Sequence, residues 1–132
     1  MRNGGEFMQL QESGEMYLET ILVLTRRNGA VRAVDVGEEM NFSKPSVSRA
    51  VHLLEDSGYL VIDRNGFLRL TETGLAHAEK IYERHNVLSA FFKCLGVSPD
   101  VAVEDACKVE HYISDETFAA IKRYKEANCK EG

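Results

Sequence analysis

The chain has 132 residues, a net charge of −5 at pH 7 and 44% hydrophobic residues. This length suits one domain or two small ones, and the hydrophobic content excludes a largely disordered chain. The net negative charge argues against nucleic-acid binding, because phosphate contacts require Lys and Arg. This argument does not hold if the basic residues are concentrated on one face of the protein. No apolar run approaches the roughly 18 residues needed to span a bilayer, and no secretory signal is visible. We therefore expect a cytoplasmic protein without a membrane partner.

The N-terminal sequence MRNGGEF shows no hydrophobic periodicity. We expect residues 1–12 to be flexible, with a natural start at Met8 and foreign residues before it. Apolar residues then recur with helical spacing from residue 16 to residue 25. Ser13 is the expected N-cap, and Asn28-Gly29 supplies a left-handed stop. These signals predict a first helix over residues 13–27.

Two short helices and a hairpin are predicted next. The apolar spacing in residues 34–40 indicates a helix that ends near Asn41. Ser43 then caps a second helix that carries Pro45 in its first turn and ends at Gly58. Short helices joined by a tight turn are typical of a helix-turn-helix. The segment YLVIDRNGFLRLT follows, with two alternating strands joined around Asn65-Gly66. This order predicts a winged helix-turn-helix domain over residues 13–72.

The remaining segments all show helical patterns. A long helix starts at Thr71 or Thr73 and ends at Gly96, and a second runs from Ser98 to about residue 112. Ser114 caps a last helix. Residues 73–132 are thus predicted to form an all-helical domain that is too small for a private core, so we expect it to dimerise. The predicted fold class is mainly α with a small β-wing.

The three cysteines are odd in number and widely spaced, in a chain without an export signal. We therefore expect reduced thiols and no disulfide. Cys94 lies in the apolar run AFFKCLG and is predicted to be a core residue. Cys129 is predicted to be exposed and inert, and Cys107 alone has polar neighbours.

The helix that begins at Ser43 has the composition of a recognition helix. Residues 41–53 contain no Asp or Glu, although acids outnumber bases in the chain. Short hydroxyls suit phosphates, and a long donor suits a base edge in the major groove. We expect Arg49 to read a purine edge, Lys44 and the wing residue Arg64 to take phosphates, and the serines to contact backbone or bases. A protein-binding winged helix is the alternative. The residues predicted to contact DNA are Ser43, Lys44, Pro45, Ser46, Ser48, Arg49 and Arg64.

Three reactive side chains share one helix face further along. Cys107, Glu110 and His111 stand at i, i+3 and i+4, which places them on one stripe at about 100° per residue. Thiolate, carboxylate and imidazole at this spacing are able to ligate one cation. A thiolate–imidazole pair on one helix face is poor geometry for nucleophilic attack, so we expect no enzyme. Further ligands must come from other elements, and the candidates, each with an ordinary structural interpretation as well, are Met16, Glu19 and His85.

Several motifs occur together in a specific order: EMYLETI, SKPSVSRAVHLLEDSGYL, LTETGLAHA, ERHNVLSAFF and DACKVEHYISDE. From about Gly14 to Phe118 the sequence resembles the iron-dependent repressors of the diphtheria toxin repressor type and their smaller manganese-sensing relatives. The resemblance implies a dimeric, metal-activated winged-helix repressor of metal-uptake genes that binds palindromic operator DNA and takes no organic substrate. It also implies metal sites between the DNA-binding and dimerisation parts. We expect the SH3-like domain of the longer members to be absent.

The resemblance also assigns ligands by position. Met16, Cys107, Glu110 and His111 coincide with the ligand set of the iron-sensing branch. His85 falls on a ligand histidine of both branches, and Glu19 falls on a metal-binding glutamate of the manganese branch. Val103 and Ser89 replace an ancillary histidine and glutamate, so the ancillary site of the iron branch is dismantled or rebuilt with Glu19.

The donor types bear on which metal is sensed. Thioether and thiolate are soft ligands that suit Fe(II), Co(II), Ni(II) or Zn(II), whereas Mn(II) prefers carboxylate, imidazole and water. We therefore expect Fe(II) as the physiological metal, with Mn(II) as the alternative and Zn(II), Ni(II) or Co(II) as occupants in vitro. Oxidation of Cys107, rather than metal binding, is the other regulatory hypothesis, because a thiol beside a histidine is reactive.

Overall fold

The computed structural model describes residues 4–129, and the chain divides into two compact units, residues 1–79 and 80–132. The first helix, α1 (Gly4–Asn28), ends as expected at Gly29, which has a φ of 86°. Its predicted start at a Ser13 N-cap is wrong, because the helix continues back to Gly4 through a segment expected to be flexible. The sequence MQLQE before Ser13 consists of strong helix formers, which favours continuation. Residues 1–3 lie outside the described residues.

The predicted helix-turn-helix is confirmed as α2 (Ala33–Met40) and α3 (Lys44–Asp56). Asn41 ends α2 in a left-handed conformation, with φ 59° and ψ 44°. Ser43 caps α3, because its hydroxyl oxygen accepts the backbone N–H of Ser46 at 3.4 Å, and Pro45 occupies the first turn. The short polar turn therefore sets both helix ends.

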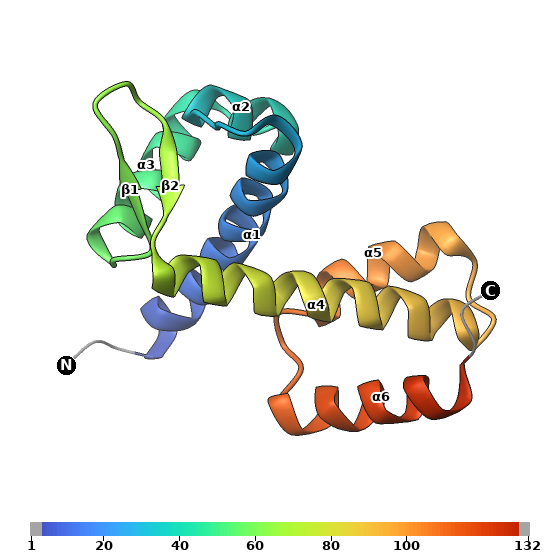
Figure 1. Cartoon of the computed structure of the whole chain (residues 1–132). Coiled ribbons are helices and arrows are strands. Elements are labelled where there is room, and N and C mark those ends of the chain that lie inside the picture. Colours follow the sequence, from blue (N-terminus) through green and yellow to red (C-terminus); the bar gives the residue numbers. More distant parts are fainter. Residues whose placement is uncertain (1–3, 130–132) are drawn as a thin grey trace. The chain divides into compact units, whose positions relative to one another are not determined.

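The wing is an antiparallel hairpin of β1 (Leu60–Ile62) and β2 (Leu68–Leu70), in which Val61 pairs with Arg69. Gly66 turns the chain with a φ of 85°, and its N–H donates to the carbonyl oxygen of Asp63. An isolated bridge joins Arg32 to Phe67, so the hairpin is attached to the segment before α2. Figure 1 shows the hairpin beside α2 and α3, which confirms the winged helix-turn-helix.

The two compact units divide within α4 (Glu72–Cys94), between residues 79 and 80. A Cβ on Gly74 would lie 1.9 Å from the carbonyl oxygen of Tyr59, so this close approach of α4 to the hairpin requires glycine. His77 places Nε2 2.7 Å from Oε2 of the buried Glu15 on α1. The first turns of α4 thus pack on the winged-helix core, whose members include Leu18, Ile21, Val51, Leu54, Leu60 and Ala78.

The second unit contains the rest of α4, α5 (Pro99–Val109) and α6 (Asp115–Asn128). Ser114 caps α6 as predicted, accepting the N–H of Thr117 at 3.1 Å. In Figure 1, α6 lies alongside α4, and the rings of Phe91 and Tyr124 meet edge to face at 6.1 Å. The prediction that the C-terminal part is all-helical is therefore confirmed. None of the helices in the described part of the chain is long and apolar enough to cross a membrane.

Three expectations about the cysteines are wrong. Cys94 and Cys129 form a disulfide, with their Cα atoms 5.9 Å apart, which is a usual separation for a disulfide. Cys94 is also exposed rather than part of the core, and Cys129 is partly buried and bonded rather than exposed and inert. The physical reason is topological: α6 returns along α4, so the last residue of α4 meets the residue that follows α6.

Candidate functional site

The second unit contains a buried carboxylate flanked by imidazoles. The side chain of Glu110, just after α5, is only 2% exposed. His85 of α4 places Nδ1 2.9 Å from Oε1 of Glu110, and His111 places Nε2 3.5 Å from Oε2. Burying a carboxylate is unfavourable unless charged or hydrogen-bonding groups compensate. The two imidazoles supply such groups, and a cation would supply a stronger one.

Cys107 adds a sulfur to this group. It lies one helical turn before Glu110, and its Sγ is 3.7 Å from Nδ1 of His85. The stripe predicted from helical spacing therefore faces a histidine of α4. Thiol, imidazole and carboxylate are donors that divalent transition metals accept, so the residues present fit such an ion. We call this group the imidazole–carboxylate cluster, and its members are His85, Cys107, Glu110 and His111.

The other two predicted ligands belong to the first unit. Met16 and Glu19 lie on α1, one helical turn apart. Met16 is 38% exposed and Glu19 is partly exposed, whereas the neighbouring Tyr17 and Leu18 are buried. The ordinary interpretation of Met16 as a core residue therefore does not apply. The thioether of Met16 and the carboxylate of Glu19 therefore lie on one face of α1.

Arg84 is a residue of this region that the sequence analysis missed. It precedes His85 on α4, and its side chain is only 8% exposed. It pairs with Asp115 at the start of α6, and Lys80 lies 3.1 Å from the same carboxylate. Lys80 first, and Arg84 with it, holds the pKa of Asp115 below its usual range. The one signal in the sequence was an arginine beside a candidate ligand within a helix.

The predicted recognition helix presents polar side chains to solvent. Lys44, Ser48 and Arg49 are exposed on α3, and Pro45 is exposed in its first turn. Ser46 is partly buried, and its hydroxyl accepts a hydrogen bond from that of Ser43 at 3.0 Å. These two serines therefore have a capping role beside any contact with DNA.

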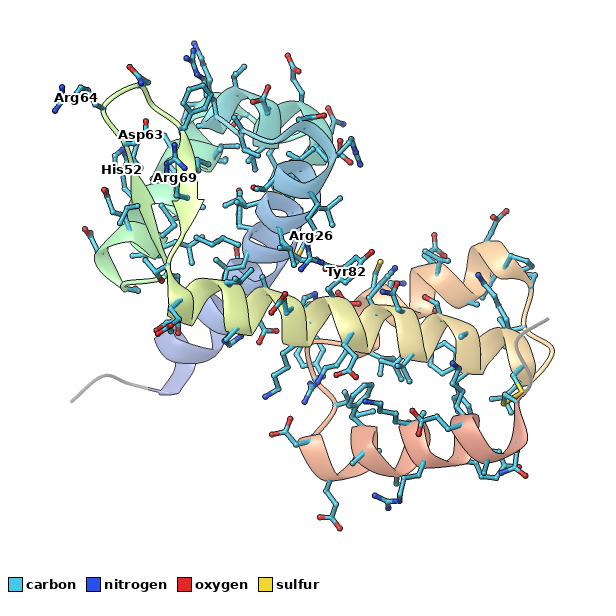
Figure 2. The ribbon with its side chains drawn as sticks, viewed as in Figure 1. Arg26, His52, Asp63, Arg64, Arg69 and Tyr82 are labelled. Atoms are coloured by element: carbon cyan, nitrogen blue, oxygen red, sulfur yellow. A yellow bond between two sulfur atoms is a disulfide. The ribbon has the colours of Figure 1, made fainter. Side chains whose placement is uncertain are left out.

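The wing tip is organised by an aspartate that the sequence analysis did not single out. The carboxylate of Asp63 accepts the backbone N–H groups of Asn65 at 2.8 Å and Phe67 at 3.0 Å, and Arg69 lies 3.2 Å away. The Phe67 N–H above all holds the pKa of Asp63 below its usual value. Aspartate before a turn commonly bonds its own backbone, which was the available signal. Figure 2 shows Arg64 extending outward from the tip that Asp63 shapes.

Comparison with known families covers both halves of the chain. Residues 9–66 match the model described as the iron dependent repressor N-terminal DNA binding domain, and residues 71–127 match the iron dependent repressor metal binding and dimerisation domain. The chain belongs to the iron-dependent repressor family. The predicted resemblance is thereby confirmed.

Relatives within the iron-dependent repressor family align over most of the chain. The transcriptional regulator MntR of Escherichia coli O6:H1 is 33% identical over 108 residues, which is 82% of this chain and 70% of that protein. An uncharacterized HTH-type transcriptional regulator of Methanocaldococcus jannaschii is 30% identical over 119 residues, which is 89% of this chain and 95% of that protein. The solved manganese regulator SloR superposes with a TM-score of 0.76 at 26% identity, covering 85% of this chain and 53% of its own. The chain thus spans about half the length of this solved relative.

Proposed function

We propose that this iron-dependent repressor family member is a metal-dependent transcriptional repressor. As a homodimer loaded with a divalent metal, it binds palindromic operator DNA and controls metal-uptake genes. The observation that carries the proposal is the imidazole–carboxylate cluster, in which the buried Glu110 lies between the imidazoles of His85 and His111, with the Cys107 thiol beside His85. The matches to a DNA-binding domain and to a metal-binding and dimerisation domain support the other two parts.

We propose that Met16 and Glu19 complete the ligand set. A bound cation would supply positive charge that offsets the carboxylates of Glu19 and Glu110. Tyr17, next to Met16, packs against Phe42 in the turn before α3, with ring centroids 6.0 Å apart. A constraint on this part of α1 therefore acts on the helix against which the recognition helix is packed. Fixing α1 favours one placement of α3, and thus the DNA-competent state.

For the physiological metal we propose Fe(II), with Mn(II) as the alternative. The Cys107 thiol lies within the cluster, and soft sulfur donors favour Fe(II) over Mn(II). Mn(II) is supported by the names of relatives, which include MntR and the manganese regulator SloR, and by the extra carboxylate of Glu19. Zn(II), Ni(II) and Co(II) are expected to bind in vitro, since they have high affinity for such donors.

Titration with Fe(II), Mn(II) and Zn(II) under anaerobic, reducing conditions tests this function. The probe is a duplex selected from random sequences by the metal-loaded chain, and anisotropy reports its binding. We expect DNA binding that requires metal and is reversed by a chelator. Free metal at 100 times its dissociation constant should raise the free energy of unfolding by about 2.7 kcal/mol. Chelator-insensitive DNA binding with an unchanged melting temperature would contradict the proposal.

Arg49 and Arg64 are expected to differ in how they bind DNA. Arg49→Ala should weaken binding to the selected duplex by about 1–3 kcal/mol and relax the preference at one base pair, because it removes a base contact. Arg64→Ala should weaken binding to all duplexes alike and reduce the slope of log K against log salt by about 1, because it removes a phosphate contact. Salt-dependent anisotropy on matched and mismatched duplexes measures both. Equal losses on every duplex for Arg49→Ala would refute base reading.

A further inference from the structure

The guanidinium of Arg84 donates hydrogen bonds to the segment that follows α5. Its Nη1 donates to the carbonyl oxygen of Glu110 at 3.1 Å and to that of Ile113 at 2.8 Å. Its Nη2 contacts the carboxylate of Asp115, and its Cζ lies 5.5 Å from the ring centroid of Phe118. One buried side chain of α4 therefore contacts the connection between α5 and α6 at both of its ends.

This connection needs such a donor. The last carbonyls of a helix have no partner within the helix and carry partial negative charge. α5 ends at Val109, and in the segment that follows the carbonyl oxygens of Glu110, the C-cap, and of Ile113 each accept an N–H of Arg84. Arginine presents several N–H donors in a rigid fork, whereas lysine offers one compact ammonium group. Arg84 is thus suited to bind two carbonyls and a carboxylate at once.

The same turn carries two members of the imidazole–carboxylate cluster, Glu110 and His111. Glu110 is held at both ends by consecutive residues of α4. Arg84 binds its backbone carbonyl oxygen, and His85 lies 2.9 Å from its carboxylate. Because both come from one helical turn, the position of the Glu110 backbone is set relative to the His85 imidazole.

We propose that Arg84 is a positioning residue of the metal site, which fixes the turn after α5 so that Glu110 and His111 face His85. This inference rests on the proposed function, because it assumes that the cluster binds a metal. Arg84 itself does not ligate the ion. It determines how little the donors must move when the ion binds, and therefore the affinity and the coordination geometry.

Arg84→Met tests the role, because it keeps the apolar stem and removes every hydrogen bond. Co(II) is the probe, since its visible bands report coordination geometry and a thiolate ligand adds a near-ultraviolet band. We expect about 10–100-fold weaker Co(II) binding, as for other residues that orient metal ligands, with altered visible bands. The matched control is Lys80→Met, which removes the other partner of Asp115 but no carbonyl contact. Its Co(II) affinity and spectrum should equal those of the unchanged protein.

Arg84→Lys separates positioning from simple charge pairing and from loss of the fold. Lysine keeps the positive charge beside Asp115 but not the fork, so Co(II) affinity should fall between that of the unchanged protein and that of Arg84→Met. Circular dichroism of the metal-free variants reports folding independently. Unchanged Co(II) affinity and spectrum in folded Arg84→Lys, or in folded Arg84→Met, would overturn the positioning role. Absence of Co(II) binding by the unchanged protein would instead refute the proposed function.

Discussion

Replacing Cys94 and Cys129 with serine is expected to lower the free energy of unfolding by about 3–4 kcal/mol, because the disulfide restricts the unfolded chain. The two cysteines are separated by 35 residues, a span that includes all of α5 and α6. α6 has no buried side chain, and its other contacts include the Arg84–Asp115 pair at its start, the Lys122–Glu83 ion pair and the Phe91–Tyr124 ring contact. Urea denaturation followed by circular dichroism measures the loss.

Reduction of the unchanged protein provides the internal comparison. Its denaturation curve in the presence of a reductant should approach that of the double serine variant, whose own curve should not respond to reductant. Cys107→Ser is the matched control, because it removes a thiol outside the disulfide and should keep the response to reductant. Identical midpoints for the oxidised and reduced protein would show that the disulfide adds no stability.

Local signals were sufficient for most helix and strand boundaries. Asn41 and Ser43 define the helix-turn-helix because a left-handed residue and an N-cap act within a few residues of themselves. The same holds for Ser114 before α6. The Ser13 prediction failed because strong helix formers precede the cap residue, and the helix propensity of that preceding segment prevailed.

The features that the sequence could not predict depend on distant contacts. The Cys94–Cys129 disulfide requires α6 to return along α4, and no local pattern encodes that return. The contacts of Arg84 join groups 26 and 29 residues away along the chain. The grouping of Cys107, Glu110 and His111 was predictable from helical spacing, because Glu110 keeps a right-handed helical conformation although α5 ends at Val109.

Glu110→Gln is expected to weaken divalent metal binding by more than about 100-fold, because it removes a direct donor where even an orienting residue costs 10–100-fold. The amide keeps the shape of the side chain but loses the negative charge at the centre of the imidazole–carboxylate cluster. Metal-dependent DNA binding should be lost with it. Isothermal titration with Mn(II) and Zn(II), followed by anisotropy on the selected duplex, measures both effects.

The metal-free Glu110→Gln variant should nevertheless unfold within about 1 kcal/mol of the unchanged protein, because the amide oxygen still accepts one hydrogen bond from an imidazole. Glu116→Gln on the exposed first turn of α6 is the matched control, since it makes the same change of charge away from the cluster. If Glu110→Gln is folded but binds neither metal nor DNA, the loss of DNA binding comes from the lost metal ligand and not from unfolding. Full metal affinity in folded Glu110→Gln would instead exclude the buried carboxylate as a ligand and leave its burial to be explained by the two histidines alone.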